Sequence, residues 1–192
     1  PVIFAKAPGV LHKSLGAPIV VPKCCQNPPE ADYEVELAVI VGREARDVSV
    51  GEALDYVMGY TVANDVSSRR WQGPKRGGGQ WSFSKSFDTF CPLGPVVVLS
   101  EGVDPQGLPL TAHVNGEERQ SSNTSDMIFC VAEIVSFLSQ GTTLVPGTVI
   151  LTGTPEGVGF ARDPPLYLRH GDVVEVAIGG IGALRNDVVY EE

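Results

Sequence analysis

The sequence lacks any apolar run that approaches the roughly 20 residues of a membrane-spanning helix, so we expect no transmembrane segment. Positive charge is also scarce, with 14 Lys and Arg residues against 23 Asp and Glu residues and a net charge of -9. Nucleic acids and anionic membranes bind basic surfaces, so neither is expected as the main partner. An anionic small molecule stays compatible with this balance, because it needs only local positive charge.

Motifs for soft metals and for nucleotides are missing too. The four cysteines include the adjacent pair Cys24 and Cys25 but no C-x-x-C motif, and we interpret them as free thiols in a reducing compartment. None of the three histidines (His12, His113 and His170) lies at ligand spacing from another. The glycine-rich stretch near the C-terminus has no GK[ST] of a Walker loop and is not a dinucleotide-binding fingerprint.

The apolar content is high enough for a packed core. Hydrophobic residues are 43% and charged residues 19% of the 192 residues, which suits one domain, with room for an appended flap. Loop or extended chain is expected over residues 16–33 and 69–81, and a hairpin over residues 171–184. Further strand-like segments are expected at residues 34–42, 60–67, 91–100, 111–120 and 148–154. This pattern predicts a mainly β, α+β domain with a mixed sheet, not a doubly wound α/β fold.

Two helices are expected among the strands. The first covers residues 48–60, where Ser49 is the expected N-cap and Glu52 its capping-box partner. Gly59 is expected to end this helix. The second covers residues 125–139, where apolar residues recur at helical spacing.

Two glutamates that are two residues apart mark the first candidate site. Glu34 and Glu36 lie on an expected strand, so their side chains project from the same face. Like charges this close repel each other, and burial makes the repulsion costly unless a cation compensates. A solvated edge strand is the alternative, but the apolar run Leu37–Val41 that follows indicates a strand that enters the core.

Asp65 is the third candidate, because it lies in a β-rich segment where Asp is disfavoured. Its alternative role is a turn or a helix cap before the SSRR stretch. Three carboxylates, with water or substrate completing an octahedron, suit Mg²⁺ or Mn²⁺ better than Zn²⁺, which prefers His or Cys. We therefore predict a divalent-metal site on Glu34, Glu36 and Asp65.

Positive charge is expected close to this site, because three carboxylates and one dication leave a net negative charge that an anionic substrate would not favour. Cationic and amide side chains follow Asp65 closely, namely Arg69, Arg70, Gln72, Lys75, Arg76 and Lys85. Those in the loop have an alternative reading as solvated surface charges. Lys85 differs, because flanking aromatic residues would desolvate it partly and make it available to a substrate carboxylate or for proton transfer.

The loop over residues 151–160 follows an expected strand and is rich in Gly and Pro. Gly153 permits close approach of the backbone, and the Thr154 hydroxyl and backbone N–H can bind a carboxylate or an oxyanion. A structural turn is the alternative reading of this loop.

Five stretches follow one another along most of the chain: EVELAVIVG, GYTVANDVSSRRWQ, SKSFDTFCPLGP, VNGEERQSSNT and ILTGTPEGVG. In this order they resemble the fumarylacetoacetate hydrolase superfamily. The stretches FCPLGP, QSSNT and PPLYLRHGD are similar to its eukaryotic domain-containing branch, whose members are associated with keto–enol tautomerisation of oxaloacetate. The resemblance implies a mixed β-sandwich roll with few short helices, usually a homodimer, with Mg²⁺ or Mn²⁺ on Glu34, Glu36 and Asp65.

The same resemblance implies roles for residues outside the carboxylate trio. The family's arginine and glutamine fall on Arg69 and Gln72, its lysine on Lys85 and its threonine on Thr154. Lys85 and Gln72 are therefore expected to act in catalysis. Arg69, Thr154 and Lys85 are expected to bind the substrate.

Two departures from the family pattern affect these expectations. Arg70 stands where the family has an acidic residue, which would add positive charge beside the site. Related hydrolases and decarboxylases carry a His-x-x-Glu lid before the P-x-I-F-x-K segment, but this chain begins at Pro1, where that lid would already have passed. Either this lid lies outside residues 1–192 or the protein lacks it, and residues 1–192 are expected to be a single catalytic domain in which the lid and any upstream region are absent. A mitochondrial or cytoplasmic location is expected, since any targeting peptide would lie before Pro1.

The expected chemistry uses a small 2-oxo acid. The substrate would chelate the metal through its carboxylate and 2-oxo oxygens, and the ion would stabilise the enolate formed when a C3 proton leaves. Tautomerisation, most simply of oxaloacetate, needs only this enolate. The first alternative is a C–C hydrolase or decarboxylase of acylpyruvate-, fumarylacetoacetate- or oxaloacetate-like substrates, where hydrolysis also needs a base to activate water. The second alternative is a metal-free, non-catalytic relic of the fold.

Overall fold

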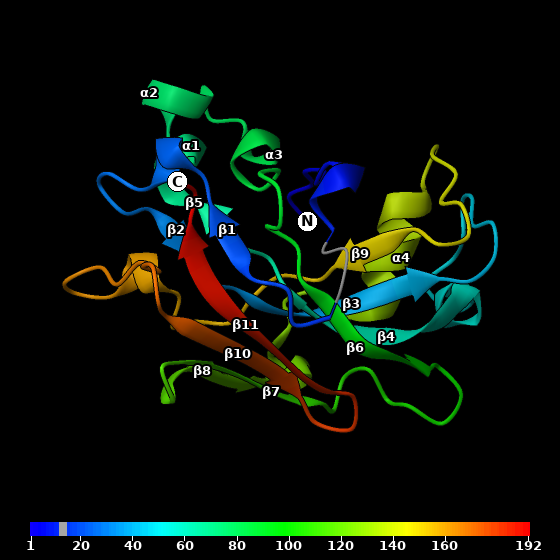
Figure 1. Ribbon diagram of the computed structural model, residues 1–192. Coiled ribbons are helices and arrows are strands. Elements are labelled where there is room, and N and C mark those ends of the chain that lie inside the picture. Colours follow the sequence, from blue (N-terminus) through cyan, green and yellow to red (C-terminus); the bar gives the residue numbers. More distant parts are fainter. Residues whose placement is uncertain (12–14) are drawn as a thin grey trace.

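Two β-sheets form the frame of the molecule in a computed structural model that describes residues 1–11 and 15–192 (Figure 1). His12 lies outside the described residues. The strands are β1 (Ile19–Val21), β2 (Ala31–Asp32), β3 (Val35–Val41), β4 (Val57–Asn64), β5 (Ser67–Ser68), β6 (Leu93–Leu99), β7 (Pro109–Val114), β8 (Glu117–Asn123), β9 (Val149–Leu151), β10 (Val173–Ile178) and β11 (Gly182–Tyr190).

The strand order makes both sheets from segments that are distant in the sequence. One sheet has five strands in the order β1-β11-β10-β7-β8, and the other has four in the order β6-β4-β3-β9. β2 and β5 form a small antiparallel pair. β1 pairs with β11 in parallel, while the other strand pairs of the two large sheets are antiparallel. The predicted mainly β, mixed-sheet fold is confirmed.

Helices are short in the described part of the chain. The α-helices are α1 (Arg69–Gln72), α2 (Pro74–Gly77), α3 (Trp81–Ser84) and α4 (Val131–Ser139). The 3₁₀ turns are η1 (Pro8–Val10), η2 (Lys23–Cys25), η3 (Ala53–Tyr56), η4 (Thr124–Asp126) and η5 (Gly159–Ala161). Within the described residues, no helix is long and apolar enough to cross a membrane.

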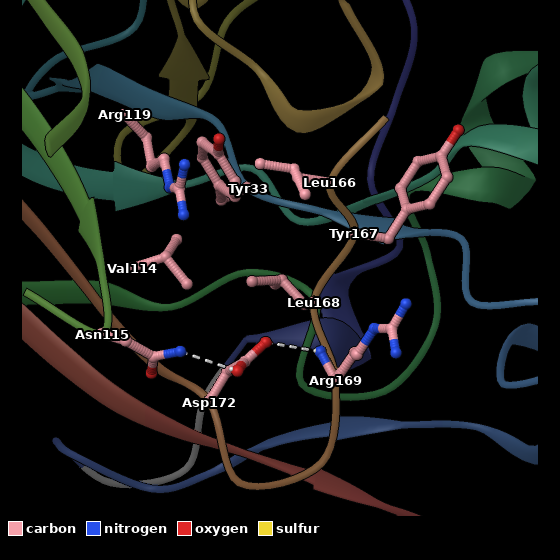
Figure 2. Close-up of a pocket in the computed structure, with 9 residues that line it drawn as sticks. All are labelled: Tyr33, Val114, Asn115, Arg119, Leu166, Tyr167, Leu168, Arg169 and Asp172. Atoms are coloured by element: carbon pink, nitrogen blue, oxygen red, sulfur yellow. Dashed lines mark hydrogen bonds between the residues drawn. The ribbon is translucent and has the colours of Figure 1, made fainter. Parts of the chain in front are cut away.

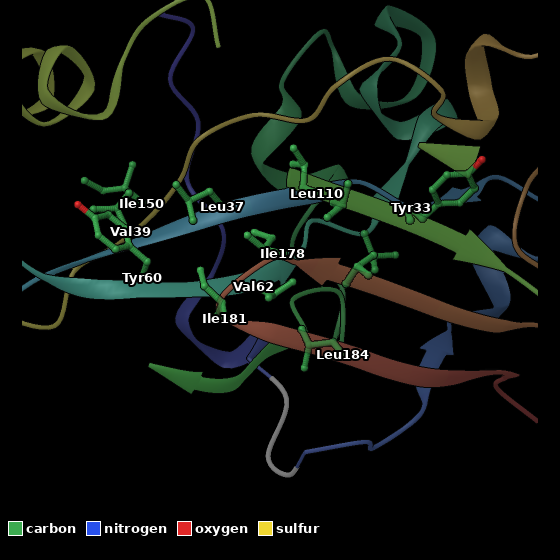
Figure 3. Packing of buried hydrophobic residues seen from close by; sticks show 14 of the residues in the cluster. Tyr33, Leu37, Val39, Tyr60, Val62, Leu110, Ile150, Ile178, Ile181 and Leu184 are labelled. Atoms are coloured by element: carbon green, nitrogen blue, oxygen red, sulfur yellow. The ribbon is translucent and has the colours of Figure 1, made fainter. Parts of the chain in front are cut away.

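The core lies between the two large sheets. Alternate residues of β10 and β7 are buried, as expected for strands with one face in the core. Leu110 and Ile178 from this sheet gather with Leu37 and Val62 from the other (Figure 3). β3 differs, because all seven of its residues are buried, which confirms the expectation that this strand enters the core.

The first expected helix is wrong over most of its length. Only the single turn η3 forms, and Gly59 lies inside β4 instead of ending a helix. Ser49 and Glu52 do contact each other, with the Ser49 hydroxyl 2.5 Å from the Glu52 carboxylate, but neither begins an α-helix. Pairing of β4 with β3 and β6 outweighs the local helical pattern.

Three other segments differ from expectation in detail. Residues 111–120, expected as one strand, contain the end of β7, a turn and the start of β8. Asn115 and Gly116 form the turn with φ of 53° and 80°, the positive values that a tight hairpin turn requires. The expected loop 69–81 contains α1, α2 and the start of α3, and the expected helix 125–139 begins only at Val131, as α4.

Gly59 allows β6 to approach β4 closely, because a Cβ at this buried position would collide with the carbonyl oxygen of Val98. We expect Gly59→Ala to lower the free energy of unfolding by about 1–3 kcal/mol through overpacking. Urea unfolding would measure the change. Gly51→Ala is the control, since no atom lies within 4 Å of its added Cβ; equal effects of the two substitutions would contradict the explanation.

Candidate functional site

Three acidic side chains meet where β3 and β4 lie side by side. Val35 of β3 pairs with Asn64 of β4. Glu34 and Glu36 are the neighbours of Val35 in the sequence, and Asp65 follows Asn64. The Asp65 backbone N–H donates to the Glu34 carbonyl oxygen at 2.9 Å. One carboxylate oxygen from each residue lies within 4.8 Å of the others, and all three residues are buried. The structure therefore brings the three predicted residues together.

Electrostatic repulsion among the three carboxylates makes this cluster a candidate cation site. Burial raises the pKa of Glu36 well above its ordinary value, and the neighbouring Asp65 and Glu34 raise it further. Lys85 and the Gly153 N–H lower it without cancelling the rise. A hard divalent cation would supply the missing positive charge, and an all-oxygen donor set is the kind that Mg²⁺ and Mn²⁺ prefer.

Lys85 is buried beside the cluster, which agrees with the expected desolvation. Only 2% of the residue is exposed, and its Nζ donates to Glu34 Oε2 at 2.7 Å and to the Asp65 carboxylate. Burial alone would lower the pKa of Lys85, but the carboxylates of Asp65, Glu34 and Glu36 outweigh it and raise the pKa. Without a metal, Lys85 is thus held firmly as an ammonium ion.

Arg69 bridges two carboxylates from helix α1. Its Nη1 lies 2.6 Å from Glu34 Oε1, and its Nε donates to Asp32 Oδ2 at 2.8 Å. Gln72, three residues later on the same helical face, accepts from Arg69 Nη1 at 3.3 Å. In the described part of the chain, the buried Nη2 of Arg69 has no hydrogen-bond partner. Arg69 therefore keeps one donor that has no partner among the described residues.

Arg70 does not add its charge to the carboxylate cluster as expected. Its Nε lies 3.4 Å from Oε2 of Glu30, a fully buried carboxylate. Consecutive helical residues point in different directions, so Arg70 cannot share the side of α1 that Arg69 uses. Arg76 contributes a longer ion pair of 4.0 Å to the same glutamate, whereas Lys75 is exposed.

Asp32 is a supporting residue that the sequence reasoning missed. Its buried carboxylate accepts hydrogen bonds from the backbone N–H groups of Tyr33, Gly159 and Phe160 as well as from Arg69. These donors hold the Asp32 carboxylate in place, so it can fix the Arg69 guanidinium. A signal was available, because acidic residues occupy every second position from 30 to 36.

The Gly-rich loop after β9 is tied to β3. The Gly153 N–H donates to Glu36 Oε2 at 2.6 Å, so the loop does bind a carboxylate, but one of this chain. The Thr154 hydroxyl donates to the Val35 carbonyl at 3.0 Å and accepts from Gln120 Nε2 at 2.8 Å. The buried Gln120, also missed from the sequence, accepts in turn from the Val35 N–H at 3.0 Å. The structure thus shows a bracing contact for Thr154, and its substrate role stays a prediction.

Lys6 is a second cation at the cluster, and sequence reasoning gave it no role. Its Nζ lies 2.6 Å from Asp65 Oδ1 and 3.4 Å from the Val66 carbonyl oxygen. Residues 1–7 have no regular secondary structure and bring Lys6 in from outside the sheets. The signal was the one that singled out Lys85, a lone lysine within an apolar stretch.

A large cavity opens onto the cluster. Its volume is about 920 Å³, and Lys6, Glu36 and Asp65 line it together with residues 153–155. Many of the other lining residues are apolar, including Ile134 of α4. The site therefore has room for a small ligand beside the carboxylates.

A second hollow of about 180 Å³ lies elsewhere and shares none of the three carboxylates (Figure 2). Asp172 lies at its edge, where its carboxylate accepts from Asn115 and from the Arg169 backbone N–H. Its small volume and internally paired polar groups make it a weaker candidate site than the cavity at the cluster.

Comparison with known proteins identifies the family. The model for the family "Fumarylacetoacetate (FAA) hydrolase C-terminal" matches residues 1–189. The chain belongs to the fumarylacetoacetate hydrolase family. The resemblance read from the sequence is confirmed.

Relatives in this family include mitochondrial oxaloacetate tautomerases. The chain is 45% identical over 190 residues to oxaloacetate tautomerase FAHD2A of Bos taurus, and 45% identical over 193 residues to that of Homo sapiens. Each match covers 98% of this chain and 59% of the relative. The chain thus spans about three-fifths of the length of these curated relatives.

Solved structures of family members have the same fold. A 5-carboxymethyl-2-hydroxymuconate delta-isomerase from Mycobacterium smegmatis is 41% identical with a TM-score of 0.89, covering 100% of this chain and 70% of that one. A maleylpyruvate hydrolase from Sphingobium sp. SYK-6, in complex with manganese(II) and pyruvate, is 33% identical with a TM-score of 0.85, covering 98% and 64%.

The raised pKa of Glu36 predicts a pH-dependent stability of the metal-free protein. A neutral Glu36 stabilises the fold, and this contribution is lost as pH rises from its ordinary value of 4.5 through the raised pKa. Glu36→Gln is neutral at every pH, so its advantage over wild type should grow as pH rises above 4.5, the ordinary pKa of a glutamate. Urea unfolding in a chelating buffer measures it.

The control for this series is Glu44→Gln, which removes the charge of an exposed glutamate. Its difference from wild type should stay constant over the same pH range, since a solvated carboxylate gains little from losing its charge. A difference for Glu36→Gln that also stayed constant would show that Glu36 is not under strain from its neighbours.

Proposed function

We propose that this chain holds Mg²⁺ or Mn²⁺ on Glu34, Glu36 and Asp65 and catalyses keto–enol tautomerisation of a small 2-oxo acid, oxaloacetate above all. The observation that carries the proposal is the buried carboxylate trio, whose oxygens lie within 4.8 Å of one another beside a cavity. The oxaloacetate tautomerases among the relatives support the reaction, and the manganese-bound hydrolase supports the metal class.

A divalent ion in this site supplies Lewis-acid stabilisation of negative charge on the substrate oxygens. The enol loses its hydroxyl proton to water, Lys85 as an ammonium ion donates a proton to C3 to give the keto form, and Lys85 is then reprotonated from water. In reverse, the neutral amine of Lys85 takes the C3 proton and water returns one to the oxygen. The free Nη2 of Arg69 binds the substrate carboxylate, and Gln72 holds the guanidinium in position. Gln72 and Thr154 keep their expected catalytic and substrate-binding roles within this proposal.

C–C bond hydrolysis is the second candidate, and hydrolases among the solved relatives favour it. This reaction needs a base that activates water. Of the histidines that the structure describes, His113 lies in β7 and His170 accepts from the Tyr190 N–H, and neither belongs to the cluster of Glu34, Glu36 and Asp65. The residues present at the cluster therefore favour tautomerisation.

Three wider properties belong to the same proposal. Residues 1–192 act as one catalytic domain, since the buried residues form one core between the sheets. The protein works as a homodimer, for which exposed apolar side chains such as Ile128 (91% exposed) offer a contact surface. It works in mitochondria, because the similar oxaloacetate tautomerases of Bos taurus and Homo sapiens are mitochondrial proteins.

Calorimetric titration with Mg²⁺ and with Mn²⁺ tests the metal site. Wild type should bind one ion, and Glu36→Gln should weaken binding by at least about tenfold, because one charged ligand is lost. Glu44→Gln removes the same charge from an exposed position and should bind as wild type does. Absence of binding to wild type would sink the proposal.

Loss of enol absorbance in oxaloacetate solutions tests the reaction. Lys85→Met should reduce the catalysed rate by about a hundredfold or more, the usual contribution of a positioned proton donor. Lys75→Met removes an exposed lysine ten positions earlier and should leave the rate unchanged. A Lys85→Met enzyme as fast as wild type would remove Lys85 from the mechanism.

A further inference from the structure

Two lysines contact Asp65 from opposite sides of its carboxylate. Lys85 bonds to Oδ2 and Lys6 to Oδ1. Their surroundings differ. Lys85 also bonds to Glu34, and its side chain is 3% exposed, whereas that of Lys6 is 11% exposed. Lys6 lines the large cavity together with Asp65 and Glu36, and Lys85 does not.

The contacts of Lys6 leave it able to bind a further anion. An ammonium group has three N–H donors. Lys6 uses one in the 2.6 Å contact with Asp65 and another in the long 3.4 Å contact with the Val66 carbonyl. One donor of Lys6, a residue that lines the cavity, therefore has no hydrogen-bond partner among the described residues.

Charge counting gives Lys6 a distinct place. Three carboxylates, one dication and the Lys85 ammonium are together neutral, and Arg69 is offset by the buried Asp32. The metal-binding carboxylate that every 2-oxo acid carries balances the charge of Lys6 in this count. Lys6 still offers a second carboxylate a local partner, because Lys6 lines the cavity, and a carboxylate left unpaired in a partly desolvated site is unfavourable.

We propose that Lys6 binds the distal carboxylate of a dicarboxylic 2-oxo acid and so determines the preference for such substrates. The inference rests on the proposed function and divides the two tasks that the sequence left to Lys85. Lys6 binds the distal carboxylate from the cavity, and the more deeply buried Lys85 transfers the proton.

Calorimetric titration with two ligands tests this assignment at saturating Mg²⁺. Pyruvate and oxaloacetate differ by the distal carboxylate alone, so the ratio of their dissociation constants isolates its recognition. Wild type should bind oxaloacetate more tightly. Lys6→Gln should raise the dissociation constant of oxaloacetate by about tenfold or more, the worth of one charge-assisted hydrogen bond, and that of pyruvate by less than about threefold.

Two further variants make the result specific. Lys6→Arg keeps the charge and should retain most of the preference for oxaloacetate. Lys23→Gln removes an exposed lysine and should leave both constants unchanged. The Mg²⁺ dissociation constant of every variant is measured first, because Lys6→Gln removes a cation that competes for Asp65 and should bind the metal at least as tightly as wild type.

The outcomes separate this inference from the proposed function. If Lys6→Gln weakens the binding of both acids equally, or of neither, Lys6 does not bind the distal carboxylate. The proposed metal-dependent function is unaffected by that result. If Lys6→Gln does not fold, wild type decides, since equal affinities for the two ligands would overturn the inference. If wild type binds no metal or neither acid, the proposed function fails as well.

Discussion

Repulsion among buried carboxylates is the constraint on which this site depends. Glu34, Glu36 and Asp65 are held together by the register of β3 and β4, so they cannot separate to relieve their charges. The protein answers with Lys85 and Lys6, yet burial and the two neighbouring carboxylates still raise the pKa of Glu36. A cluster of this kind costs folding free energy, and binding of a dication by the three carboxylates is an interaction that would offset the cost.

The surrounding contacts give this cluster its rigidity. Gln120 and Thr154 bond to both backbone groups of Val35, the residue between the two glutamates. On the other side, Asp32 is held by three backbone N–H groups and holds Arg69. The positions of the carboxylate oxygens in the cluster therefore depend on residues outside it, as is usual where preorganisation matters.

Sequence reasoning succeeded where a local pattern carries the answer. The two-residue spacing of Glu34 and Glu36 and the apolar run behind them predicted a buried strand with both carboxylates on one face. It failed where a partner comes from far along the chain, since Lys6 is 59 residues from Asp65 and Gln120 is 85 from Val35. No spacing rule reports such contacts. The helix expected before β4 failed for the related reason that strand pairing overrode a local capping pattern.

The site thus combines two kinds of support with different consequences. The three carboxylates are fixed by paired strands and by the loop that Gln120 and Thr154 brace, so changes there would disturb the metal. Lys6 instead comes from residues 1–7, which pair with neither sheet. A change in that segment can alter the charge that meets the substrate while the carboxylates stay in place. Loops and irregular segments on a rigid scaffold are where specificity is adjusted most easily, and on this physical ground the role proposed for Lys6 and the role proposed for the three carboxylates can change independently.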